Sequence, residues 1–260
     1  MFLLQRRNLT PSCPSCVVVV NRLSVYCLLA GCSVLAAEQP VPTVVSESHR
    51  QPLPQVPLTV QGKGPAVIFI GGFGDEISRI MPHTMHRMPT LADGPETRAY
   101  YHWHAGQPAD IEQGATEISS HIAAYRRNNP GADVILIGHS MGASMALRVA
   151  HLLNPEDGSV YVMTLDPADR SYTPRRPDAV NWWGNAYVAN SLSGHDYIAV
   201  MGGRWKSCRQ ADVNLRFDGR KRDEAGLHYI HDNALSLLLS RGTKQGVSLY
   251  EILRNILITK

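Results

Sequence analysis

From residue 65 onward, short apolar runs alternate with longer segments of helical periodicity. The run Pro65–Ile70 (PAVIFI) ends in two glycines, as expected of a strand buried on both faces of a parallel sheet. Asp110–Asn129 places apolar residues on one helical stripe, and Asn-Pro-Gly ends it. Further strands are expected at Thr97–Ala105, Asp133–Ile137, Ser159–Pro167, Asn181–Ala189 and Asp212–Phe217, and further helices at Met141–Leu153, Tyr197–Met201, Asn233–Ser240 and Ser248–Ile258.

This alternation predicts one α/β domain over residues 60–260, with a mainly parallel sheet covered by helices on both faces. Functional sites in such open sheets form at the carboxyl ends of the strands. Residues 76–96 and 168–203 are candidates for a lid or a substrate wall. His83 and His86 are expected in a loop of the first of these segments.

The N-terminal region has the features of an export signal followed by a tether. Arg22 precedes an apolar run and small residues, and Leu-Ala-Gly-Cys at 29–32 resembles the lipobox of bacterial lipoproteins. That resemblance implies a signal over residues 1–31, cleavage before Cys32, lipidation of its thiol, and anchoring in the bacterial cell envelope on the periplasmic side. Several acyl chains would hold the domain on the membrane. An ordinary secretory signal, giving a secreted protein, is the next alternative, and an uncleaved membrane anchor is the last. Pro-rich residues 32–59 are expected to form the tether.

Charge and cysteine content agree with export and argue against a nucleic-acid-binding protein and a disulfide-rich protein. The chain has 25 Lys and Arg against 22 Asp and Glu, and three of the arginines lie in the predicted signal. The mature chain is therefore close to neutral, and no nucleic-acid partner is indicated. Only Cys208 would remain as a free thiol after lipidation of Cys32, so no disulfide framework is expected.

The stretch DVILIGHSMG holds the strongest chemical signal in the chain. Ser140 stands between Gly138 and Gly142, directly after a strand and before an apolar helix. A sharp strand-to-helix turn needs glycine on both sides, because side chains there would collide. The serine hydroxyl would then stand at the carboxyl edge of the sheet, beside the positive end of a helix.

Gly138–Gly142 resembles the nucleophile elbow of the α/β-hydrolase superfamily, which includes lipases, esterases and thioesterases. The resemblance implies a Ser, acid, His order along the chain. Asp166 follows the next strand and is the preferred acid, as in some animal lipases, and Asp196 is the alternative. His231, directly before a closing helix, is the preferred base over His228.

The same resemblance implies an oxyanion hole made by the backbone N–H groups of Phe73 and Met141. The Gly-rich loop at residues 71–74 follows the first strand, where the superfamily supplies its second donor. Gly71 stands where the lipase loop usually carries His.

The sequence thus predicts a serine hydrolase that cleaves a carboxylic ester or thioester of a small molecule or lipid through an acyl-enzyme. An acyltransferase with the same site and a non-catalytic, membrane-tethered binding protein are the alternatives. No cofactor is implied. His102 and His104 share one strand face, but no third metal ligand is evident near them, so a pair beside a pocket is favoured.

Overall fold

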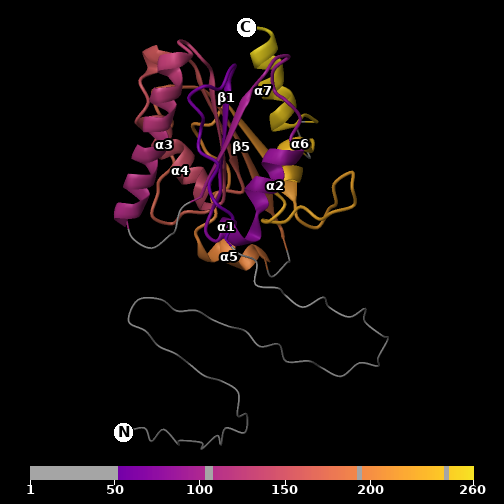
Figure 1. Cartoon of the computed structure of the whole chain (residues 1–260). Coiled ribbons are helices and arrows are strands. Elements are labelled where there is room, and N and C mark those ends of the chain that lie inside the picture. The colour runs from indigo at the N-terminus through magenta and orange to yellow at the C-terminus, as the bar shows by residue number, and fades with distance from the viewer. Residues whose placement is uncertain (1–51, 103–107, 192–194, 243–245) are drawn as a thin grey trace, which may run out of the picture. The chain divides into compact units, whose positions relative to one another are not determined.

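The computed structural model describes residues 52–102, 108–191, 195–242 and 246–260 (Figure 1). The chain divides into two units, residues 1–47 and residues 48–260, and the second is the one described below. The predicted signal, Cys32, Trp103 and His104 lie outside the described residues, so lipidation and membrane anchoring stay predictions. No helix within the described ranges is long and apolar enough to cross a membrane.

Six parallel strands form one sheet in the order β2-β1-β3-β4-β5-β6. Each strand is close to its predicted position. The central strands β1, β3 and β4 are short, fully buried and mostly apolar runs, whereas β6 alternates buried and partly exposed residues. Their bounds are β1 Ala66–Ile70, β2 Thr97–Tyr101, β3 Val134–His139, β4 Val160–Leu165, β5 Val180–Ala189 and β6 Val213–Asp218.

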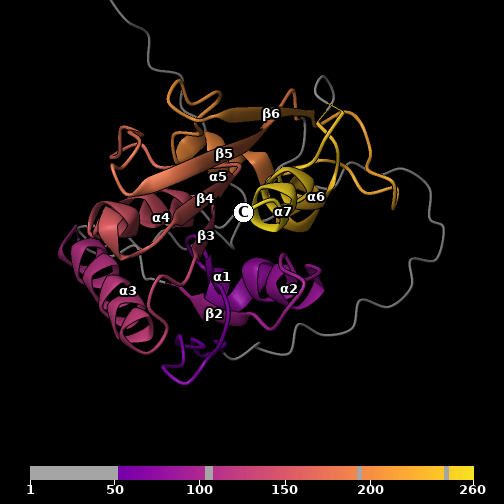
Figure 2. The ribbon, with the colours of Figure 1, turned by 90° about the horizontal axis from the view of Figure 1, so that it is seen from above.

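Helices cover both faces of this sheet (Figure 2). One face carries α3 and α4, and the other carries α2, α6 and α7. The short helices α1 and α5 lie at the carboxyl ends of the strands (Figure 1). The helix bounds are α1 Asp75–Ser78, α2 Ile80–Arg87, α3 Pro108–Asn128, α4 Met141–His151, α5 His195–Met201, α6 Ala234–Leu239 and α7 Leu249–Ile258.

The alternation of side chains along each strand builds a separate core on each face. Ile68 and Leu136 pack with the residues of α3 and α4, whereas Phe69 and Ile135 pack with those of α2, α6 and α7. All four side chains are fully buried. The predicted fold class, a mainly parallel α/β sheet with helices on both faces, is therefore confirmed.

Two segments differ from their sequence-based description. Residues 80–87, expected as a loop with His83 and His86, form α2. Pro82 stands in the first turn of this helix, where the missing N–H group breaks no helical hydrogen bond. Part of the predicted tether packs on the domain: Val56 exchanges backbone hydrogen bonds with Tyr100 at the edge of the sheet, and Leu58 is buried.

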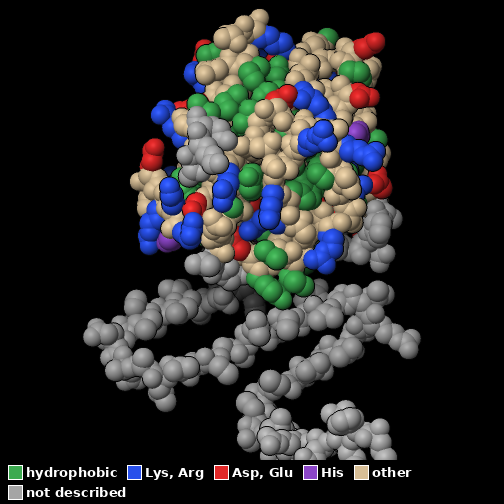
Figure 3. Space-filling model, turned by 180° about the vertical axis from the view of Figure 1, so that it is seen from behind, with side chains coloured by type: hydrophobic (Ala, Val, Ile, Leu, Met, Phe, Trp, Pro, Cys, Tyr) green, Lys and Arg blue, Asp and Glu red, His purple; other side chains and the backbone are tan. Residues whose placement is uncertain are grey.

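Exposed hydrophobic side chains gather at the carboxyl edge of the sheet. Of the ten large hydrophobic residues exposed in the described part of the chain, five lie in or beside α1 and α5. These are Phe73, Ile77, Tyr197, Val200 and Met201. In the view from behind, hydrophobic side chains collect at the lower edge of the domain (Figure 3). This edge therefore offers an apolar surface beside the site described next.

Leu136→Ala tests the core between the sheet and the helices α3 and α4. Leu136 is fully buried in the central strand β3, so its truncation should cost about 2–5 kcal/mol of the free energy of unfolding. Leu152→Ala, at a side chain that is 52% exposed after α4, is the matched control and should change it by about 0.5 kcal/mol or less. Urea unfolding of both variants checks this, and equal losses would contradict the assigned core.

Candidate active site

Ser140 stands at a strained turn between β3 and α4. Its backbone has φ 55° and ψ −125°, a conformation that residues other than glycine rarely adopt. Neighbouring backbone leaves little room for side chains around the turn. A Cβ atom at Gly138 would lie 2.3 Å from the Gly142 carbonyl oxygen, and one at Gly142 would lie 2.2 Å from the Ile70 carbonyl oxygen. Both predicted glycine positions are thus required by the turn.

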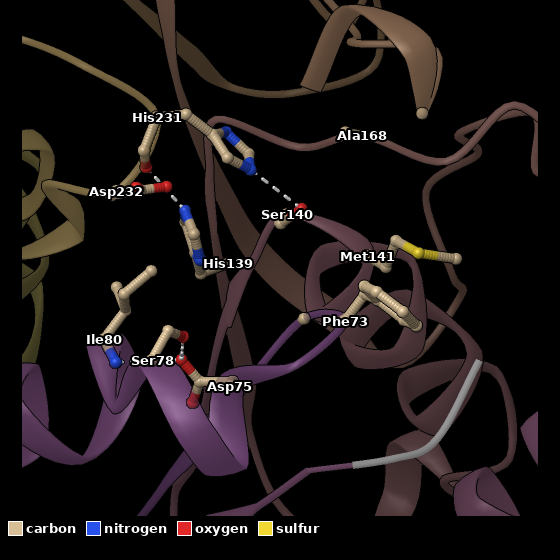
Figure 4. A pocket seen from close by; sticks show the side chains of 12 residues that line it. Phe73, Asp75, Ser78, Ile80, His139, Ser140, Met141, Ala168, His231 and Asp232 are labelled. Atoms are coloured by element: carbon tan, nitrogen blue, oxygen red, sulfur yellow. Dashed lines mark hydrogen bonds between the residues drawn. The ribbon is translucent and has the colours of Figure 1, made fainter. Parts of the chain in front are cut away.

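Three side chains predicted from the sequence meet at this turn, and Figure 4 shows the contact between two of them, Ser140 and His231. The Ser140 Oγ lies 3.0 Å from His231 Nε2, and His231 Nδ1 lies 2.7 Å from Asp166 Oδ2. All three residues are buried. Since the carboxylate can only accept, Nδ1 carries the proton and Nε2 is left to accept the Ser140 proton.

Asp166 accepts hydrogen bonds from two groups besides His231. Its Oδ1 accepts the Val188 N–H at 2.9 Å, and its Oδ2 also accepts from Arg204 at 2.8 Å. The same Arg204 nitrogen pairs with buried Asp196. The guanidinium thus offsets the charge of two buried carboxylates, which would be costly if unpaired. Asp196, the alternative acid, is joined to Asp166 through Arg204.

A second buried imidazole, that of His139, lies beside His231. His139 Nε2 donates to the His231 carbonyl oxygen at 2.7 Å, and the two rings lie 4.7 Å apart. Burial, with the nearby His231, lowers the pKa of His139 from 6.5 to about 3. His139 is therefore neutral at ordinary pH, and its hydrogen bond holds the backbone of His231.

Ser140 faces a cavity of about 350 Å³ at the carboxyl edge of the sheet (Figure 4). Phe73 and Met141, the predicted oxyanion residues, both line it together with Ser140 and His231. Met141 is the first residue of α4, where backbone N–H groups lack intrahelical acceptors and the helix end is positive. The volume is that of a small-molecule site.

Asp75, expected simply as a helix-start residue, is buried in the cavity wall. It accepts from the Tyr100 hydroxyl at 2.8 Å and from the backbone N–H groups of Ile80 and Met81. Burial raises the pKa of Asp75, although these hydrogen bonds oppose the rise. Asp75 thereby ties the glycine loop to both β2 and the start of α2.

The remaining candidates lie apart from the Ser140–His231 contact. His228 is exposed, and its backbone pairs with that of Arg222. His83 and His86 are exposed on α2. The ring of His102 packs edge-on against Tyr100. The backbone carbonyl of His102 accepts a hydrogen bond from the Gln55 side chain. Within the described ranges, no three His, Cys, Asp or Glu side chains are placed to hold a metal ion.

Sequence reasoning missed Arg204, His139 and the true role of Asp75. Arg204 lies 38 residues from Asp166 along the chain, and its segment is placed there by pairing with Ala168. Nothing local in the sequence reports that contact. His139 did carry a signal, because it is the single polar side chain in an otherwise apolar buried strand.

Neither a protein-family model nor a curated protein matches the sequence. Solved structures of similar arrangement include an esterase domain from Rhodothermus marinus (12% identity, 70% of this chain and 87% of that one, TM-score 0.39). An α/β serine hydrolase without lid from Xanthomonas campestris shares 13% identity over 63% of this chain and 76% of its own, with a TM-score of 0.38. Est1E from Butyrivibrio proteoclasticus has 12% sequence identity to this chain, and the match covers 76% of this chain and 88% of Est1E, with a TM-score of 0.39.

These likenesses are too distant to carry an argument about activity. The fold is defined by the molecule itself. The parallel sheet, the sharp turn between β3 and α4, and the order of Ser140, Asp166 and His231 along the chain are those of an α/β-hydrolase fold.

The neutral His139 predicts a pH dependence of stability. The unfolded chain takes up a proton at this side chain below pH 6.5, whereas the folded chain does so only near pH 3. Stability should therefore fall as the pH drops through this window, by up to about 1.4 kcal/mol per pH unit.

His139→Gln keeps an N–H donor but cannot titrate. Urea unfolding between pH 6 and 4 should give this variant a smaller slope of unfolding free energy against pH than the wild type. Parallel slopes for the two proteins would contradict a buried neutral His139.

Proposed function

We propose that this protein is a serine hydrolase that cleaves a carboxylic ester or thioester through an acyl-enzyme. The observation that carries the proposal is the continuous contact from Ser140 Oγ to His231 Nε2 and from His231 Nδ1 to Asp166 Oδ2. The strained turn at Ser140 favours the same role, since strain of about 1–3 kcal/mol persists where the surrounding structure enforces a functional geometry.

In the proposed reaction, His231 takes the Ser140 proton as Oγ attacks the substrate carbonyl. The backbone N–H groups of Phe73 and Met141 bind the resulting oxyanion. His231 then gives the proton to the leaving alcohol or thiol, and the acyl group stays on Ser140. A water molecule, deprotonated by His231, attacks this ester. The bond from the acyl carbon to Oγ breaks, His231 returns the proton to Ser140 Oγ, and the acid product leaves. Asp166 holds the imidazole in the required tautomer throughout.

The cavity favours an apolar acyl group. Its surface is mostly apolar, and one end lies between Phe73, Met141 and Ala168. The exposed hydrophobic side chains of α1 and α5 extend the apolar surface outside this end. An acyl chain would be removed from water there at about 0.8 kcal/mol per CH₂ group.

Two other functions use the same fold. An acyltransferase would pass the acyl group to an alcohol in place of water, which product analysis separates from hydrolysis. A binding protein would keep the fold without the chemistry. Hydrolysis is preferred over the binding protein because a buried, hydrogen-bonded Ser, His and Asp set is costly to maintain without a use.

The first prediction concerns the nucleophile and the base. Ser140→Ala and His231→Ala should each lower kcat for hydrolysis of an activated ester by about 10⁴-fold or more. His228→Ala, three residues away and exposed, is the matched control and should keep kcat within about twofold of wild type. Loss of activity in His228→Ala but not in His231→Ala would move the base and contradict the proposal.

The second prediction separates the two buried carboxylates. Asp166→Asn leaves His231 in the wrong tautomer and should lower kcat by about 10⁴-fold. Asp196→Asn changes a partner of Arg204 and leaves the contact between His231 and Asp166 in place, so it should lower kcat far less, by about tenfold or less. Steady-state kinetics on one ester measures both, and the reverse order of effects would assign the acid to Asp196.

A further inference from the structure

A second cavity, of about 290 Å³, adjoins the one that contains Ser140. The two share Ser78, Ile80 and Asp232 in their walls. Unlike the first, the second has a mostly polar lining. Arg79 and His83 contribute to it from the start of α2, and Asn233 from the segment before α6. The two cavities are therefore neighbours, one with a mostly apolar and one with a mostly polar lining.

The position of His231 decides which part of an ester enters each cavity. His231 must hand its proton to the leaving oxygen, so the alcohol lies on the imidazole side of Ser140. Asp232 follows His231 directly and lies on that side with Ile80 and Ser78, whereas Phe73 and Met141 lie on the other (Figure 4). The alcohol therefore points toward the polar cavity, and the acyl group toward the apolar end.

The polar cavity contains donors and acceptors in balance. Arg79 is a cation and Asp232 an anion, while Ser78 and His83 offer hydrogen-bonding groups. The Asn233 side chain also lines the cavity, where it caps the start of α6. A cation and an anion in the same lining disfavour both an anionic and a cationic ligand, whereas several hydroxyl groups suit such a mixed lining. At ~30 Å³ per water, the space equals that of roughly ten water molecules, which is room for a small polyol.

We infer that this cavity is the leaving-group subsite, and that it selects esters of neutral, hydroxyl-rich alcohols such as glycerol or a sugar. The inference rests on the proposed function and specifies its substrate class. His83 is the specificity-determining side chain most open to test, since it is exposed on α2 and lines this cavity but not the one that contains Ser140.

The experiment compares esters that share one acyl group. Monohexanoylglycerol and propyl hexanoate have alcohols of the same carbon length and differ by two hydroxyl groups. Each kcat/KM of the full chain is divided by the rate of hydroxide-catalysed hydrolysis of that ester, which removes the difference in intrinsic reactivity. The wild type should prefer the glycerol ester by about tenfold or more, as one or two added hydrogen bonds allow.

Two variants on the same helix locate the effect. His83→Leu should lower the corrected ratio of kcat/KM for the glycerol ester to kcat/KM for the propyl ester toward a value of one. His86→Leu should keep the wild-type preference, because His86 is equally exposed on α2 but lines neither cavity. An unchanged preference in His83→Leu, or an equal loss in both variants, would overturn the assignment of His83.

Failure of the subsite and failure of the proposed function give different results. A corrected preference near or below one, with hydrolysis that still depends on Ser140, would overturn the subsite and leave the hydrolase proposal intact. Faster cleavage of hexanoyl glycerophosphate than of the glycerol ester would overturn the assignment to neutral alcohols. Hydrolysis of neither ester, nor of an activated ester, would contradict the proposed function and the subsite with it.

Discussion

The close approach of three backbone segments around Ser140 is the constraint on which the site depends. A Cβ atom at Gly72, Gly138 or Gly142 would lie within 2.8 Å of an atom across the turn. Because β1, β3 and α4 can come this close, Ser140 is forced to φ 55° and its hydroxyl projects from the sheet edge. The first N–H groups of α4 and the glycine loop after β1 then flank the same cavity.

Around this turn, several buried polar side chains form hydrogen bonds with one another or with the backbone. Arg204 joins Asp166 to Asp196, His139 supports the backbone of His231, and Asp75 ties the glycine loop to Tyr100. Such networks rigidify a site when every member is satisfied, and they are costly when one member is lost. The positions of His231 and Asp166 are thus held by residues outside the three to which we assign the chemistry.

How far sequence predicts this molecule depends on how local each signal is. The strands and Ser140 follow from short patterns, namely apolar runs and glycines at fixed spacing. Asp166 and His231 follow from their places after strands, once the resemblance to the α/β-hydrolase superfamily is accepted. The structure brings these three together and leaves His228 outside.

Contacts between segments that are distant in the sequence could not be predicted from such local patterns. Arg204 reaches Asp166 only because the chain after α5 pairs with Ala168, which no periodicity reports. The segment of α2 predicts a loop because its proline and two histidines are weak helix formers. In the structure, Met81 and Met85 lie on the buried side of this helix. The packing of Val56 on the sheet edge was hidden by the proline-rich composition around it.

The central claim is that Ser140 is an activated nucleophile. Labelling of the folded full chain with a fluorophosphonate, followed by peptide mass spectrometry, tests it most directly, because such probes react with activated serines. The account predicts one phosphonyl group per chain, carried by Ser140. A folded protein that stays unlabelled, or carries the label on another serine, would contradict it.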